Sequence, residues 1–298
     1  MKKFVTRFVL FLLPAIIFLT VAELYVRSIP NIYTFKDQWM WKHGQDIQTL
    51  VLGNSHAYYD MNPSVMGDGV FSLANVSQRL EHDLFLLKRY EKACPQLHTV
   101  VAVVDNSNLF DIPMEEEEPA RLTYYQLYMG YDKHPVCSRY GFELANIFSF
   151  WQKVGNHFRK EPLACDSLGW GIAYNTDKRP QDALSPERLS MHNLRSWKDV
   201  VPNVQAIFEL ATWCKEHQLR LIIVQTPVSK MYQEEVPAIQ KTYLQFVMNC
   251  CRLRYGALIA DFSDDGTFIP TDFFDADHLS SQGAEKFSIK MKALLEND

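Results

Sequence analysis

The chain has 298 residues, of which 47% are apolar and 22% are charged, a balance typical of a globular protein with a substantial core. Its formal net charge is −5 and it carries no basic stripe, so composition excludes a protein that binds nucleic acid through charge. The six cysteines include no C-x-x-C pair, which argues against a zinc or dithiol site.

The N-terminus combines basic residues with a long apolar run. The run extends from Phe8 to Val26 and is interrupted by Pro14 and Glu23. At 1.5 Å per residue, about 19 helical residues nearly span a bilayer core. We expect residues 1–27 to form a membrane anchor; a cleaved signal peptide and a buried helix of a soluble protein are the alternatives. The basic residues place the N-terminus in the cytoplasm and the remaining chain outside the cell membrane, or secreted after cleavage.

Five short apolar runs are predicted strands. They lack the alternation of polar and apolar residues that marks a half-exposed strand, which is typical of parallel sheets covered on both faces. In chain order they are Thr49–Gly53, Gly69–Ala74, His98–Asp105, Leu219–Pro227 and Gly256–Phe262.

Helical patterns alternate with these strands. Apolar residues recur at helical spacing in the intervening segments, and this alternation predicts a doubly wound α/β domain with right-handed crossovers. The predicted helices are Gln78–Cys94, Val201–Gln218, Val236–Tyr255 and Gln282–Leu295.

The domain boundaries follow from the same patterns. Residues 28–46, rich in aromatic residues, are expected to be a linker, and residues 47–298 an α/β domain. Residues 111–200 break the alternation of strands and helices. A structureless loop of that length would be unusual, so we expect an insertion with some helices, which would be the natural substrate-selecting element.

Ser55 follows the first predicted strand, in the sequence GNSH. In open α/β sheets, ligands bind beyond the carboxyl ends of the strands. A helix that begins there would direct backbone N–H groups at a developing negative charge. A serine nucleophile also needs a base and a group that orients the base. Without them, Ser55 would be the N-cap of a tight turn.

The C-terminal sequence DADH supplies both groups. A carboxylate three residues before a histidine can turn back within one loop, hold one imidazole nitrogen and leave the other to face the serine. We expect His278 to be the base and Asp275 the orienting carboxylate, with Asp277 as the alternative. His278 could instead be a loop histidine bonded to the backbone. The ring of His56 is expected to point away, into packing.

The sequence LGNSHA resembles the first block of the SGNH/GDSL hydrolases, and DADHLSSQGA resembles their last block, D-x-x-H. The resemblance covers Thr49 to about Leu295, apart from the insertion. It implies a three-layer, flavodoxin-like fold with a five-stranded parallel sheet. It also implies acyl transfer from esters by Ser55, His278 and Asp275, without a metal or an organic cofactor.

The middle blocks of the family supply the oxyanion hole. They place a glycine N–H after the second strand and an asparagine side chain after the third. Here SLANVSQ contains no glycine, and Ser77 is expected at that position; VVDNSN offers Asn106 first and Asn108 second. The N–H of Ser55 would be a further donor. The G-x-N-D pattern itself is absent.

The resemblance implies a membrane-anchored esterase or O-acyltransferase that acts on acyl, chiefly acetyl, esters of cell-envelope glycans. Some anchored members of this superfamily resemble partners of multi-spanning membrane acyltransferases, including the D-alanine transfer protein of teichoic acids, so acyl transfer with such a partner is one alternative. A non-catalytic glycan-binding protein on the same scaffold is another. Several aromatic residues could form a carbohydrate platform, although core or surface packing is the simpler interpretation; they are Tyr58, Tyr59, Trp151, Trp170 and Trp197.

Overall fold

The computed structural model describes residues 2–174 and 181–296. The chain separates into two compact units. The first comprises Met1–Asp37 and Glu118–Leu163, and the second comprises Gln38–Glu117 and Ala164–Asp298. The insertion predicted at residues 111–200 is therefore divided between the two units.

The second unit is built on a parallel sheet of five strands, in the order β2-β1-β3-β4-β5. All residues of β1, β2 and β3 are buried, as expected for strands covered on both faces. Each strand lies within one of the predicted runs, so these predictions are confirmed. The strands are β1 Thr49–Leu52, β2 Val70–Ser72, β3 Thr99–Val103, β4 Arg220–Gln225 and β5 Leu258–Asp261.

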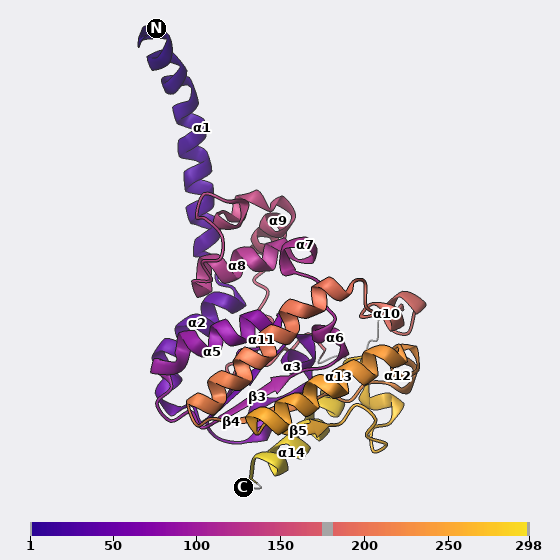
Figure 1. Ribbon diagram of the computed structural model, residues 1–298. Helices are drawn as coiled ribbons and strands as arrows, with labels where there is room; N and C mark the ends of the chain where they lie inside the picture. Colours follow the sequence, from indigo (N-terminus) through magenta and orange to yellow (C-terminus); the bar gives the residue numbers. More distant parts are fainter. Residues whose placement is uncertain (1, 175–180, 297–298) are drawn as a thin grey trace. The chain divides into compact units, whose positions relative to one another are not determined.

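Helices pack on this sheet in two groups. Figure 1 shows α5 (Leu80–Tyr90), α11 (Trp197–Glu216) and α13 (Ala238–Cys250) side by side across one face. A separate group forms where α14 (Ser281–Glu296) contacts α3 (Ser55–Asp60) and α4 (Pro63–Met66). The predicted α/β class is thus confirmed. Shorter helices complete the unit: α6 Asn106–Leu109, α7 Met114–Glu117, α10 Pro186–Ser190 and α12 Lys230–Glu235.

The predicted linker is instead largely helical. Residues 28–46 contain α2 (Ile32–His43), whose first turn is capped by Asn31: its side-chain oxygen accepts hydrogen bonds from the N–H groups of Tyr33 and Thr34. Tyr33 and Met40 are buried. Two residues of the predicted linker, Tyr33 and Met40, are therefore core residues of a helix, whereas Trp41 is exposed.

Among its described residues, the first unit holds the beginning of α2 and, in full, α1 (Lys2–Ser28), α8 (Pro119–Met129) and α9 (Ile147–Phe158). Short 3₁₀ turns at Arg139–Gly141 and Glu143–Ala145 precede α9. α1, the N-terminal helix in Figure 1, is long and apolar enough to cross a membrane. Most of its apolar side chains are exposed.

Candidate active site

Ser55, His278 and Asp275 come together at the carboxyl end of β1. Nε2 of His278 lies 2.9 Å from Oγ of Ser55. On the other side of the ring, Nδ1 of His278 lies 3.0 Å from Oδ1 of Asp275. His278 and Asp275 are buried, whereas Ser55 is partly exposed. The hydrogen bonds run in the order expected for a nucleophile, a base and an orienting carboxylate.

The turn after β1 leaves the Ser55 hydroxyl available to His278. Gly53 has φ of +136°, and a Cβ there would lie 2.9 Å from Cβ of Val103, so this position requires glycine. Asn54 is the N-cap of α3, since its side-chain oxygen accepts from the N–H of His56. The alternative that Ser55 serves as the N-cap is therefore wrong.

The last loop is closed by the orienting carboxylate itself. Oδ1 of Asp275 accepts hydrogen bonds from the N–H groups of Asp277 and His278, at 3.2 and 2.9 Å. The next N–H, of Leu279, donates to Oδ1 of Asp60 at the end of α3. Burial raises the pKa of Asp60 well above its ordinary value. The loop is thus held against the helix that carries Ser55.

A second histidine lies behind the triad. Nδ1 of His56 is 2.6 Å from Asp105, and its Nε2 is 3.1 Å from Asp277. Burial alone would lower the pKa of His56, but Asp105 and Asp277 raise it well above its ordinary value. His56 is buried and points away from Ser55, as expected, because consecutive side chains of α3 point about 100° apart. The expectation that it only packs is wrong, since both ring nitrogens meet carboxylates.

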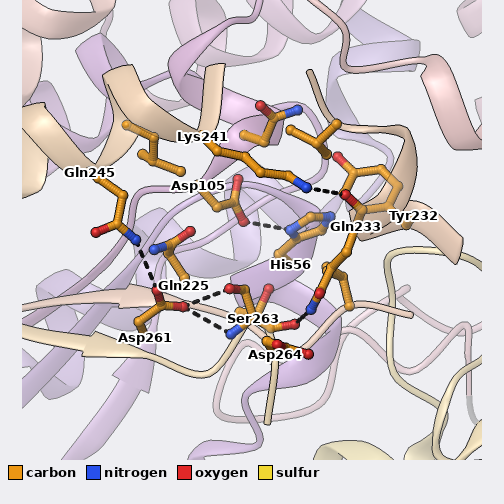
Figure 2. A pocket seen from close by; sticks show the side chains of 15 residues that line it. His56, Asp105, Gln225, Tyr232, Gln233, Lys241, Gln245, Asp261, Ser263 and Asp264 are labelled. Carbon is orange, nitrogen blue, oxygen red and sulfur yellow. Dashed lines mark hydrogen bonds and ion pairs between the residues drawn. The ribbon is translucent and has the colours of Figure 1, made fainter. Parts of the chain in front are cut away.

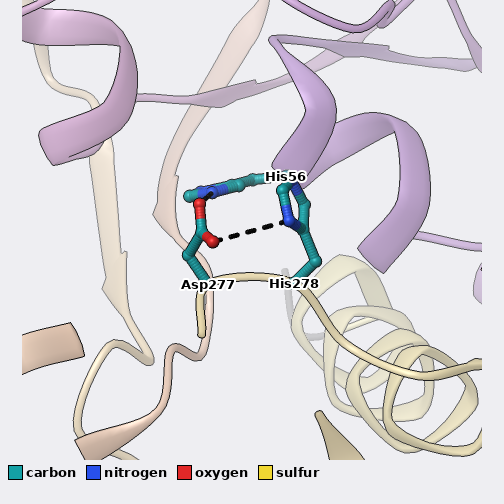
Figure 3. Close-up of side chains that lie close together, drawn as sticks. All are labelled: His56, Asp277 and His278. Atoms are coloured by element: carbon teal, nitrogen blue, oxygen red, sulfur yellow. Dashed lines mark hydrogen bonds and ion pairs between the residues drawn. The ribbon is translucent and has the colours of Figure 1, made fainter. Parts of the chain in front are cut away.

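Asp277 does not replace Asp275 as the orienting carboxylate. Its Oδ1 is 3.6 Å from Nδ1 of His278, and its Oδ2 binds His56. Burial alone would raise the pKa of Asp277, but the facing histidines, His278 foremost, lower it well below its ordinary value. Asp277 therefore joins the two histidines electrostatically (Figure 3).

Arg188 brings a guanidinium to this cluster from α10. Its Nη2 lies 2.7 Å from Oδ2 of Asp275 and 2.7 Å from Oδ1 of Asp277. The same atom is 2.6 Å from Nδ1 of His278. A base that accepts at Nε2 carries its proton on Nδ1, so Nδ1 donates to Asp275 while Arg188 donates to the other oxygen of that carboxylate. Arg188 thus fixes the carboxylate that orients the base.

An aromatic stack stands beside His278. The Tyr174 ring lies between those of Tyr59 and Phe274, with centroid separations of 3.9 and 4.0 Å. His278 meets Tyr59 and Tyr174 edge-on, at 5.8 and 5.3 Å. Both faces of the Tyr174 ring are covered by its neighbours, so this stack offers apolar contact beside His278 chiefly through ring edges.

The other aromatic residues considered for a carbohydrate platform have packing or structural contacts. The Tyr58 hydroxyl donates to the carbonyl oxygen of Ala164, and the Trp170 indole N–H donates to the carbonyl oxygen of Tyr59. Trp197 packs on Tyr243. Trp151 belongs to the first unit.

The oxyanion donors predicted after β2 and β3 stay predictions. Ser77 has φ of +58°, in the left-handed region that favours glycine, and its carbonyl oxygen accepts from Arg79. The Asn106 amide donates to the carbonyl oxygen of His192 and also bonds the Tyr232 hydroxyl. Asn108, the second choice, instead closes the capping box of α6 with Asp105.

A cavity of about 360 Å³ opens at the carboxyl ends of β3, β4 and β5 (Figure 2). Among the described residues its lining includes His56 and Asp105 but not the triad. Thr226, also in the lining, has a buried hydroxyl without a hydrogen-bond partner. The far side of the cavity is formed by residues of α12 and α13, including Tyr232, Gln233, Lys241, Leu244 and Gln245.

His56, Asp277 and His278 also offer three potential metal ligands within 4.8 Å of one another (Figure 3). Each is already engaged: His56 by Asp105 and Asp277, and His278 by Ser55 and Asp275. Arg188 supplies a cation against the Asp277 carboxylate. A metal would therefore have to displace hydrogen bonds and an ion pair that already balance the charges.

The comparisons with known proteins name no family for this chain. A scan against protein-family models found no match, and a search of curated proteins found no similar sequence. Function must therefore be argued from the chemistry of the site.

Proposed function

We propose that the protein is a membrane-anchored serine esterase or O-acyltransferase of the SGNH type, acting outside the cytoplasm on acyl, chiefly acetyl, esters of cell-envelope glycans. The hydrogen-bonded series Ser55–His278–Asp275 carries the proposal. The strand order β2-β1-β3-β4-β5 supports a flavodoxin-like fold, in which ligands bind at the switch point between β1 and β3. Ser55 follows β1 at that point.

In the proposed reaction, His278 Nε2 takes the Ser55 proton as Oγ attacks the ester carbonyl carbon. Asp275 holds Nδ1–H and stabilises the imidazolium. The tetrahedral intermediate then collapses to an acyl-serine, and His278 returns the proton to the departing alcohol. Water or a sugar hydroxyl attacks the acyl-serine, which releases an acid or a new ester.

The oxyanion would be held by the N–H groups of Ser55 and Ser77 and by the side-chain amide of Asn106, which would exchange one of its present hydrogen bonds, to His192 or to Tyr232, for the oxyanion. Each such donor is worth about 10²–10³ in rate. The left-handed conformation of Ser77 supports this assignment, because the related family has a glycine there and the backbone takes a conformation typical of glycine.

The aromatic stack and α1 support the substrate class. The stack of Tyr59, Tyr174 and Phe274 would give a sugar ring apolar contact beside His278. α1, as an anchor, would keep the enzyme near polymers of the envelope.

The proposal is tested with a fluorophosphonate probe and with p-nitrophenyl acetate. Wild type should be labelled and should turn over the ester, while Ser55→Ala should lose labelling and at least about 10³-fold in kcat. Ser64→Ala, an exposed serine near the start of α4, is the matched control and should behave as wild type. An unlabelled, inactive wild type would favour the non-catalytic glycan-binding alternative.

Hydrolysis and transfer are separated by the product. With an acetylated donor and an unacetylated oligosaccharide, hydrolysis yields only acetate, whereas transfer yields an acetylated oligosaccharide. Transfer that needs a multi-spanning membrane acyltransferase would appear only when that partner is reconstituted with the protein.

A further inference from the structure

The first unit exposes an apolar face of α9. Phe148, Trp151 and Phe158 recur at helical spacing and lie on one side of the helix. They are 85%, 62% and 72% exposed. Isolated exposed apolar residues are common, but several large ones on one face mark an interaction surface.

The adjoining side of α9 packs on the last turn of α1. Val154 forms an apolar cluster with Val26 and Ile29, and Phe150 packs against it. One turn further along α9, the His157 ring meets Tyr25 edge-on, with centroids 6.4 Å apart. α9 is therefore fixed at the level where the apolar run of α1 ends.

Glu23 marks the same level. This buried carboxylate accepts hydrogen bonds from the N–H groups of Glu143 and Leu144, both at 3.0 Å, and it pairs with Arg27. Arg27 also donates to the carbonyl oxygen of Gly141. The acidic residue that interrupts the apolar run is thus balanced by residues 141–144, and the exposed apolar surface of α1 ends at Leu24 and Tyr25.

We infer that α9 is an interfacial helix, which inserts Phe148, Trp151 and Phe158 into the headgroup region of the bilayer that α1 crosses. The inference rests on the proposed anchoring by α1. Because α9 is packed on the last turn of the apolar run, its exposed face lies where that run would leave the hydrocarbon core. Tryptophan is enriched at this depth, and amphipathic helices bind there through their apolar faces.

The partner is a lipid surface rather than a soluble protein because the exposed face continues the exposed apolar surface of α1 within one compact unit. A multi-spanning membrane protein would cover the same face through a specific contact. Pure lipid vesicles distinguish the two.

The experiment places the full-length chain in phosphatidylcholine vesicles with bromine atoms at shallow or deep positions of the acyl chains. Trp151 fluorescence is obtained as the difference between wild type and Trp151→Phe, a substitution that keeps an aromatic ring on the face. We expect Trp151→Phe to remove most of the bromine-quenched fluorescence, with shallow bromines quenching more than deep ones. Trp197→Phe, which removes a half-exposed indole of the second unit, is the matched control and should leave the quenched fraction unchanged.

The outcomes separate the inference from the anchor on which it rests. If the protein does not float with the vesicles, the proposed anchoring fails and the inference fails with it. If it floats but Trp151→Phe leaves the quenched fraction unchanged, the anchor stands and the interfacial helix is refuted. Protection of Trp151 only in the presence of a multi-spanning acyltransferase would also refute the lipid contact and assign the face to that protein.

Discussion

The two halves of the insertion after β3 have different surroundings. Residues 118–163 pack with α1 in the first unit and expose the aromatic face of α9. Residues 164–200 belong to the second unit and bring Tyr174 and Arg188 to the triad. The prediction of one substrate-selecting insertion is therefore too simple. Only the second half lies against the proposed catalytic residues within its own unit, and the first half is built around the apolar helix.

The largest expected effect tests whether the first half of the insertion, residues 118–163, is independent of the second unit. Lys153 is buried and pairs with Glu143 at 2.6 Å. Glu143→Ala leaves this ammonium buried without its carboxylate, which should cost about 3–5 kcal/mol of the stability of the first unit. Hydrogen exchange should rise across residues 118–163, while turnover of p-nitrophenyl acetate in detergent stays within about twofold of wild type, because small-ester chemistry depends on the second unit.

The matched control is Glu161→Ala, which breaks only the exposed ion pair with Arg159 and should cost less than about 1 kcal/mol. A parallel fall of ester turnover in Glu143→Ala would contradict the distinction between the two halves, because the first half would then support the second unit directly.

The second-largest expected effect is a pH dependence of the unfolding free energy. It comes from His192, in the second half of the insertion. Burial lowers the pKa of His192 to about 4. Between pH 6.5 and pH 4, the unfolded chain therefore binds more protons at His192 than the folded chain does. The stability that neutral His192 gives the folded state is present above pH 6.5 and is lost as the pH falls. The loss should reach about 3 kcal/mol near pH 4.

Other buried groups act in the opposite direction over this range. Burial raises the pKa of Asp83 and of Asp111 to about 7, so both stabilise the folded state as the pH falls. The measurement is therefore the difference in urea unfolding free energy between wild type and His192→Gln, followed from pH 7 to pH 4.5. A difference that does not change with pH would show that His192 titrates normally.

Much of the fold and the centre of the site could be predicted from local sequence. The strands are unbroken apolar runs, and burial on both faces imposes that pattern wherever a parallel sheet forms. Ser55, Asp275 and His278 were recognisable because the serine follows a strand and the carboxylate and imidazole share one loop. These features depend on a few neighbouring residues.

The remaining site residues depend on contacts between distant parts of the chain. Arg188 reaches Asp275 across 87 positions of sequence, from a short helix in the insertion with no periodic pattern. His56 was misjudged because its partners, Asp105 and Asp277, come from two other parts of the chain. Its place directly after Ser55, at the end of a strand, was the only local signal.

The third prediction concerns Arg188. Arg188→Met should lower kcat for p-nitrophenyl acetate by about 10–100-fold, because Asp275 and Asp277 lose a shared cation and the carboxylate that orients His278 is no longer held. Arg188→Lys should recover part of the loss. Arg195→Met removes an exposed guanidinium from the same half and should leave kcat within about twofold. If both methionine variants behave alike, the second half does not organise the triad.

The smallest expected effect separates the two aromatic surfaces. Tyr174→Ala removes the middle ring of the stack, and each aromatic pair contributes about 0.5–1.5 kcal/mol. If the stack binds the sugar, Tyr174→Ala should raise KM for a soluble acetylated oligosaccharide about fivefold. The change in KM for p-nitrophenyl acetate, which carries no sugar, should be much smaller. Trp151→Ala should leave both soluble substrates unaffected, because that ring is assigned to lipid. An equal rise in KM for the oligosaccharide in both variants would show that the α9 face binds glycan. Both halves of the insertion would then help to select the substrate.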